Sequence, residues 1–251
     1  MGANGGVLAD FQGGLVVAKS DGSIVKLDGL TGQARTLYTL PAQSGAGVGV
    51  HPDGTVFAVR RDGENSWSVV GLDPVAGLKF TVTLSSACTV AGVSGNIGQL
   101  IVAGDGYGYL PYSCVGNGVN YLGTYRVSSG GAWDNIAVAS SPNPRGERIA
   151  PPYVITNADT GVLLSWEDVP TGAKMLAVTT GTAARVTSGP VISGQGFGAV
   201  RPVLQAQDGS FVGTTSLATG ETPRMVAFDG SGRCGGRRPT RRRGSRRRRA
   251  G

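Results

Sequence analysis

Residue types that commonly perform catalysis are scarce in this sequence. Its single histidine, His51, lies in the segment VHPDGT. A lone histidine cannot form a histidine-rich metal site, and a Ser-His-Asp triad would have to use it as the base. The neighbouring sequence offers no partners for such a triad. We therefore expect His51 to be a turn residue before Pro52, packed near the edge of a sheet, with a catalytic base as the alternative.

The three cysteines show no metal-binding pattern, because none belongs to a Cys-x-x-Cys motif. Cys88 and Cys114 flank a segment that a disulfide between them would pin down, as is common in exported proteins. We predict this pairing, with Cα atoms within roughly 7 Å of each other. The alternative is two unrelated buried thiols. Cys234 lies in an arginine-rich tail and would remain unpaired.

Oxygen ligands for a metal are few. Asp105 in AGDGYGY, and Asn157 with Asp159 in TNADTG, could bind calcium. Neither segment has the alternating oxygen ligands of a calcium-binding loop, so no metal site is expected. The glycines around Asp105 do not join a strand to a helix, as a phosphate-binding loop requires.

Three tyrosines gather in the segment GDGYGYLPYSCVGNGV, which we interpret as a long insertion. Exposed tyrosines in a loop make good contact residues, because they offer a large area and few rotatable bonds. These rings are our candidates for binding a ligand or partner. The alternative is that they cover the edge of their own sheet. They are Tyr107, Tyr109 and Tyr112.

The composition points to short strands and frequent turns as the elements that position these residues. Of 251 residues, 43 are glycine and 13 are proline, while 40% are hydrophobic and 16% charged. The chain is too apolar to be generally disordered, and its glycines lack the collagen period. No apolar run reaches the length of a membrane span, and no signal peptide opens the chain. A turn-rich all-β protein remains.

Alternating β-formers identify the strands, and Asp-Gly pairs separate them. Residues 78–91 form the longest stretch without glycine or proline, and there Phe80, Val82 and Leu84 alternate with polar residues. Asp-Gly pairs occur at residues 21, 53, 62, 208 and 229 and favour tight hairpins. The other predicted strands are Leu15–Lys19, Ser23–Leu27, Thr55–Arg60, Trp67–Leu72, Gln99–Ala103, Gly161–Trp166, Met175–Thr179, Ser210–Thr214 and Met225–Phe228.

These strands recur with a period. A strand followed by a polar turn returns at intervals of 45, 53, 53 and 50 residues, and each interval holds about four strands. Repeats of this length and strand number are typical of β-propeller blades. We predict four-stranded antiparallel blades, about five in number, that form an incomplete propeller, since the fifth ends after three strands. The blade turns are expected near Asp28, Asp73, Ser128, Thr180 and Asp229.

The first repeat, LVVAKSDGSIVKLDGLTGQ, resembles PQQ-binding-like (quinoprotein-like) propeller repeats in its Asp-Gly turn, Leu-Asp strand end and Thr-Gly turn. Residues 47–59, GVGVHPDGTVFAV, are similar to repeats of NHL and streptogramin-lyase propellers. The third and fourth repeats have lost the Leu-Asp-x-x-Thr-Gly pattern. Members of the resembled family carry a quinone on a dedicated set of side chains, which we cannot match here, so no cofactor is expected.

The positive charge is confined to the end of the chain. The formal net charge is +7, but residues 233–251 hold ten of the 23 basic residues and none of the 16 acidic ones, so residues 1–232 carry −3. We predict a propeller over residues 1–232 and a disordered tail over 233–251. A genuine tail would bind nucleic acid without sequence preference. The arginines concerned are Arg241, Arg242, Arg243, Arg246, Arg247, Arg248 and Arg249.

The tail has a second interpretation. A further apolar strand should follow RMVAFDGSG, but after Gly232 only Arg, Gly, Ser, Thr, Pro, Ala and Cys are found, largely the residues that a GC-rich coding strand yields when it is read out of frame. This change favours a frameshift near codon 232 that truncates the propeller.

The functional hypothesis is a non-catalytic binding or scaffold module, part of a larger exported bacterial-type protein that is extracellular or periplasmic. Its partner would be a protein or glycan. One alternative is part of an enzymatic propeller, a lyase or quinoprotein dehydrogenase, whose active residues lie in missing blades. The other is nucleic-acid binding through the tail.

Overall fold

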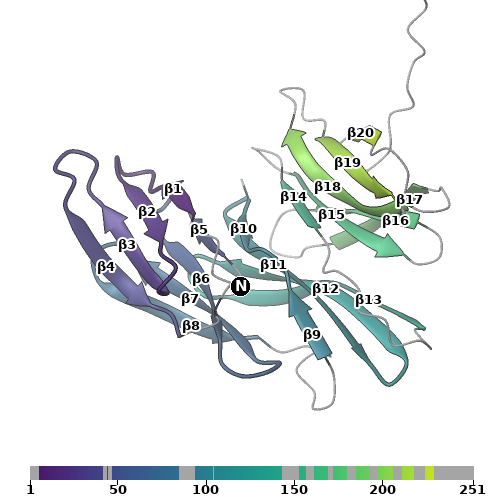
Figure 1. Cartoon of the computed structure of the whole chain (residues 1–251), viewed down its shortest axis with the longest axis horizontal. Helices are drawn as coiled ribbons and strands as arrows, with labels where there is room; N and C mark the ends of the chain where they lie inside the picture. The colour runs from purple at the N-terminus through teal and green to yellow at the C-terminus, as the bar shows by residue number, and fades with distance from the viewer. Residues whose placement is uncertain are drawn as a thin grey trace, which may run out of the picture.

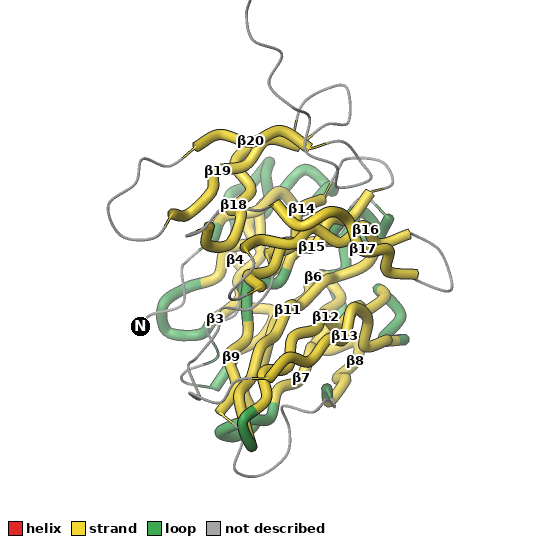
Figure 2. The backbone as a smooth tube through the Cα atoms, turned by 90° about the vertical axis from the view of Figure 1, so that its right-hand side faces the viewer, coloured by secondary structure: helices red, strands yellow, loops and turns green. Residues whose placement is uncertain are grey.

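The structure is a computed structural model of the 251-residue chain. It describes residues 6–41, 44, 47–84, 94–103, 105–142, 153–156, 161–168, 172–179, 185–192, 197–205, 211–217 and 224–228. The described residues form strands, turns and no helix (Figure 2). Accordingly, no helix among them is long and apolar enough to cross a membrane. The all-β prediction is confirmed for this part of the chain.

The first two sheets, blades one and two, each contain four strands in sequence order, with every neighbour antiparallel. The hairpins turn at glycines such as Gly22 and Gly54, whose φ angles are +87° and +89°. Only glycine adopts such angles without strain, which explains the Asp-Gly pairs. The strands are β1 (Val7–Ala9), β2 (Leu15–Ala18), β3 (Ser23–Leu27) and β4 (Ala34–Thr39), then β5 (Val48–Val50), β6 (Val56–Arg61), β7 (Trp67–Asp73) and β8 (Gly77–Thr83).

Blade three differs because its first strand is interrupted. β9 and β10 pair with different parts of β11, where Pro111 cannot donate a backbone hydrogen bond. β11 and β12 are joined by Asn117 and Gly118, both at positive φ, as in the tightest hairpin turns. The strands are β9 (Ser94–Ile97), β10 (Ile101–Val102), β11 (Tyr107–Gly116), β12 (Val119–Ser128) and β13 (Trp133–Pro142).

Among the residues that the structure describes, blade four has four strands in sequence order and blade five has three, as expected. Their neighbouring strands are antiparallel throughout. The strands are β14 (Tyr153–Thr156), β15 (Gly161–Asp168), β16 (Gly172–Thr179), β17 (Arg185–Ile192), β18 (Phe197–Gln205), β19 (Phe211–Leu217) and β20 (Arg224–Phe228).

The blades pack in a row, each against the next. β1 and β4 contact blade two, β5 contacts β10, β11 and β13 contact blade four, and β18 contacts blade four from the other side. Figure 1 shows blade one and blade five at opposite ends of this row, which is open. Apolar side chains fill the spaces between sheets: one core joins Val16 and Ile24 to Val56 and Leu72, and another joins Phe57 to Leu110.

The structure confirms three predicted blade turns and corrects one expectation. Turns follow Asp28, Asp73 and Ser128, while Thr180 and Asp229 lie outside the described residues. Phe80, Val82 and Leu84 face inward to different degrees, and residues 79, 81 and 83 are exposed, as the alternation predicts. The expected long insertion in blade three is wrong, because residues 107–116 form strand β11. The tail and the boundary at Gly232 also lie outside the described residues.

Candidate functional site

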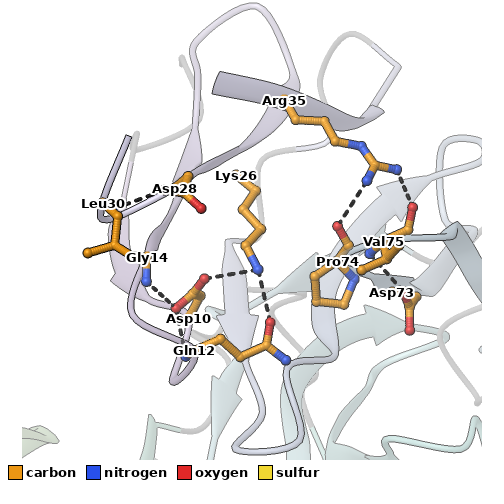
Figure 3. A network of polar contacts seen from close by, with 10 residues as sticks. All are labelled: Asp10, Gln12, Gly14, Lys26, Asp28, Leu30, Arg35, Asp73, Pro74 and Val75. Carbon is orange, nitrogen blue, oxygen red and sulfur yellow. Dashed lines mark hydrogen bonds and ion pairs between the residues drawn. The ribbon is translucent and has the colours of Figure 1, made fainter. Parts of the chain in front are cut away.

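Two kinds of turn lie at one edge of each blade. In an antiparallel sheet of consecutive strands, the turn between the first two strands and the turn between the last two meet at the same edge. We call the edge formed by these turns in blades one to three the turn face; it comprises residues 10–14, 28–33, 51–55, 73–77, 105–107 and 128–132. Adjacent blades touch there: the guanidinium of Arg35 in blade one donates to the carbonyls of Pro74 and Val75 in blade two (Figure 3).

Aspartate side chains build the turn face by accepting backbone N–H groups of their own turns. Asp53 Oδ1 accepts from Thr55 N at 2.8 Å, and Asp105 Oδ1 accepts from Tyr107 N at 3.1 Å. Asp28 and Asp73 each accept two such bonds. These bonds favour the charged carboxylate, so the pKa values of Asp28 and Asp73 are lowered mainly by backbone N–H groups. The carboxylates therefore stabilise turns.

Asp10 is the most buried of these carboxylates, with 1% of its surface exposed. Its Oδ1 accepts from Gln12 N and Gly14 N, and its Oδ2 lies 3.1 Å from Nζ of Lys26 (Figure 3). Lys26 also donates to Oε1 of Gln12 at 2.9 Å. Burial alone would raise the pKa of Asp10, but the two backbone bonds and Lys26 outweigh it and lower the pKa. This network fixes the first turn of blade one.

His51 joins blades two and three. Its Nδ1 lies 2.8 Å from Oδ1 of Asp53, and a Cβ on Gly106 would lie only 2.8 Å from its Nε2. The ring also stands edge-on to Phe57. One nitrogen thus faces a carboxylate of its own turn and the other packs on the backbone of blade three. This geometry fits the expected packed turn residue better than a base facing substrate.

The side chain of Ser129 in blade three also lies close to Asp53 and helps to stabilise its charged form. Burial raises the pKa of Asp53, but Thr55, Ser129 and His51 outweigh burial and hold the pKa well below its ordinary value. A carboxylate with a lowered pKa stabilises the folded state above its unfolded pKa, and the contribution is lost as the pH falls toward the folded value.

We expect Asp53→Asn to lower the free energy of unfolding at neutral pH by about 1 kcal/mol, a modest figure because the side chain is 41% exposed. The variant should also lose less stability than the wild type when the pH falls below about 4, where unfolded aspartates begin to protonate. Urea unfolding followed over a pH series measures both effects. An equally steep acid dependence in the variant would contradict this account.

The tyrosine candidates are not exposed loop residues. Tyr109 and Tyr112 lie on β11 with 0% and 1% of their surfaces exposed, and Tyr107 is half-buried. The expectation of exposed rings is therefore wrong for Tyr109 and Tyr112, because β11 is a central strand: Tyr112 packs in the core shared with blade two, and Tyr109 is buried on the other side of the sheet beside Arg126. The hydroxyl of Tyr109 donates to Asp105 at 2.5 Å; burial and this bond raise its pKa. The Tyr112 hydroxyl lies 3.0 Å from Oδ1 of Asn135.

Sequence reasoning missed Arg126, the largest fully buried side chain among the described residues. The strand register places it between Tyr109 on β11 and Asp134 on β13. It donates to Asp134 at 2.5 Å, and its guanidinium lies 4.4 Å from the Tyr107 ring centre. Burial would lower the pKa of Arg126, but Asp134 outweighs burial and raises it. One signal in the sequence could have identified it: Arg126 stands where the first repeat has the aspartate of its Leu-Asp pair.

The candidate metal ligands and the predicted disulfide lie only partly within the described residues. The described residues contain no group of three or more histidine, cysteine or acidic side chains that could hold a metal. Asn157 and Asp159 lie outside them. Cys114 is disulfide-bonded, whereas Cys88 and Cys234 lie outside the described residues, so the predicted pairing remains a prediction.

Large apolar side chains are exposed on the turn face. Phe11 is 63% exposed and held at a φ of +59°, which is strained for an aromatic residue. Leu30 is 98% exposed and Val75 74%. They stand on successive turns of blades one and two, and Leu78 and Trp133 at the starts of β8 and β13 are also exposed.

Comparison with known proteins identifies the fold. No known protein family and no curated protein matches the chain. An oligogalacturonate lyase in complex with manganese superposes with a TM-score of 0.53 at 16% identity, covering 88% of this chain and 61% of that one. The fold is an open β-propeller.

Two further solved structures are less similar. TolB from Acinetobacter baumannii has a TM-score of 0.48 at 13% identity, and the chain covers 50% of its length. The N-terminal domain of Nup159 has a TM-score of 0.43 at 12% identity, and the chain covers 60% of its length. The propeller thus spans half to three fifths of the length of these three proteins.

Proposed function

We propose that the chain is part of a non-catalytic propeller that binds a protein partner on its turn face. The supporting observation is the exposure of Phe11, Leu30 and Val75 on adjacent turns of that face. Protein interfaces combine exposed aromatic and aliphatic anchors with a polar rim, here supplied by Asp28 and Asp73. Large aliphatic side chains suit a protein surface better than a glycan.

The chemistry of the turns supports binding over catalysis. The aspartates described above accept hydrogen bonds within their own turns, and both nitrogens of His51 face protein groups. A general base needs a ring nitrogen or carboxylate directed at the substrate. We further propose that the blades are PQQ-binding-like repeats that hold no quinone; the support for this is the sequence pattern of the first repeat. Export is supported by the disulfide of Cys114, since such bonds persist in oxidising compartments.

Selection of a displayed random-peptide library on the propeller tests this proposal. We expect peptides with apolar anchors to be enriched and to lose about tenfold or more in affinity for the double variant Leu30→Asp/Val75→Asp. The matched control, Lys19→Asp/Glu64→Lys, changes exposed residues on turns at the opposite edge and should retain binding.

Three results would overturn the proposal. They are equal loss of binding in both double variants, binding of a glycan array in place of peptides, and saturable turnover of a small substrate.

A further inference from the structure

The turn at residues 10–14 of blade one holds a phenylalanine in a backbone conformation that phenylalanine avoids. Phe11 has a φ of +59° and Asn117 a φ of +53°; they are the two non-glycine residues with positive φ in the part of the chain that the structure describes. Asn117 precedes Gly118 in a tight hairpin turn, where asparagine is a preferred residue. Phenylalanine has no such preference, so the conformation of Phe11 is strained.

Burial does not compensate for this strain. The side chain of Phe11 is 63% exposed, so folding removes little of the ring from water. Glycine at this position would relieve the strain, because it adopts positive φ freely. A residue that is both strained and exposed lowers the stability of the fold, and such residues are concentrated at functional sites. The conformation of Phe11 therefore indicates a role in binding.

A polar network holds both neighbours of Phe11 in place. Oδ1 of Asp10 accepts from Gln12 N at 2.8 Å and from Gly14 N at 2.6 Å, which closes the turn around Phe11. The ammonium group of Lys26 lies 3.1 Å from Oδ2 of Asp10 and donates to Oε1 of Gln12 at 2.9 Å (Figure 3). One cation on β3 thus joins the residue before Phe11 to the residue after it.

Gln12 also connects this turn to blade two. A Cβ on Gly54 would lie 2.6 Å from Nε2 of Gln12 and 3.3 Å from Cγ of Pro74, so the three residues are closely packed. Phe11 directly precedes Gln12, and Val75 directly follows Pro74. Packing between turns therefore fixes where the backbone of Phe11 stands relative to that of Val75.

We infer that Phe11 is the aromatic anchor of the turn face and that Lys26 and Gln12 are positioning residues, which hold Phe11 in its binding conformation. This inference rests on the proposed function. Aromatic side chains are enriched in protein interfaces. An anchor that is already held in place loses little freedom on binding, and this raises affinity. Stability and binding then make opposite demands on residue 11.

The variant Phe11→Gly of the full chain tests the anchor. We expect it to raise the urea midpoint of unfolding, because the strain is relieved. It should also weaken binding of the peptides selected on the wild type by about tenfold or more, as measured by calorimetric titration. Phe11→Tyr keeps the ring and should retain the wild-type affinity. The matched control, Asn117→Gly, changes the other residue of positive φ, at the opposite edge, and should also retain it.

Gln12→Ala tests the positioning role. It should weaken peptide binding about threefold or more, and Phe11→Gly should cost less affinity in this background than in the wild type, because the ring is no longer held. Gln12→Glu keeps an acceptor for Lys26 and should restore the affinity. The matched control is Gln99→Ala, which removes another exposed glutamine that packs near a glycine of blade two, Gly47, and should bind like the wild type.

Several results would overturn the inference. Wild-type affinity in Phe11→Gly, together with loss of binding in Leu30→Asp/Val75→Asp, would refute the anchor and leave the proposed function standing. A lower urea midpoint in Phe11→Gly would show that Phe11 supports the fold. Additive losses in the Phe11 and Gln12 variants would refute the positioning role. A library that yields no binding peptide would overturn both proposals. If Phe11→Gly fails to fold, Phe11→Asn, which also suits positive φ, decides the question.

Discussion

Replacing Phe57 with alanine should remove about 3–5 kcal/mol from the free energy of unfolding. The Phe57 ring is 0% exposed and lies in the core between blades two and three. Its centroid is 6.1 Å from that of Phe80, and a Cβ added to Gly108 of blade three would lie 3.5 Å from its edge. Truncation leaves a cavity that two rigid sheets cannot close. Urea unfolding measures the loss.

Phe11→Ala is the matched control for this prediction, because it deletes the same atoms from a ring that is 63% exposed. Its effect on the free energy of unfolding should stay within about 0.5 kcal/mol. Similar losses in the two variants would show that Phe57 does not hold blades two and three together.

Gly29→Ala should cost about 2–3 kcal/mol, because the new methyl group would overlap a backbone atom. A Cβ on Gly29 would collide with the carbonyl oxygen of Gly13, so the two turns of blade one could no longer touch. Separation of the turns would also strain the Asp10 network that begins at the same turn. The free energy of unfolding in urea reports the loss.

The control is Gly63→Ala, at a turn glycine with ordinary φ whose nearest neighbour for a Cβ is Ser66 Cβ at 3.7 Å. That substitution should be neutral or slightly stabilising, since alanine has less freedom than glycine in the unfolded chain. An equal cost at both positions would contradict the proposed contact between turns.

Strands and turns were predictable where their causes are local. Ser23–Leu27 was predicted with the observed bounds, and the turns after Asp28 and Asp73 fall where expected. Alternation of β-formers and Asp-Gly chemistry act within a few residues, so one repeat contains the information. The short opening strand β1 was missed because Val7–Ala9 offers only three residues and gains its order by pairing with β2.

The site was less predictable because burial depends on packing between blades. Glycine and proline near Tyr109 suggested a loop, yet β11 crosses the middle of blade three, with Tyr112 packed against blade two and Tyr109 buried on the other side of the sheet. The contact of Arg126 with Asp134 depends on a register that shifts between Leu122 and Thr124. The exposure of Leu30 and Val75 on one face likewise follows from how two blades stand together.

The arrangement of the blades in a row also bears on how such proteins change over evolutionary time. Each of blades two to four contacts the blade before it and the blade after it, and the described residues show no extensive contact between more distant blades. Duplication or loss of a whole repeat therefore disturbs two interfaces and leaves the others as they were. A lineage can lengthen or shorten such an array by whole units while the interior of each unit stays under unchanged selection.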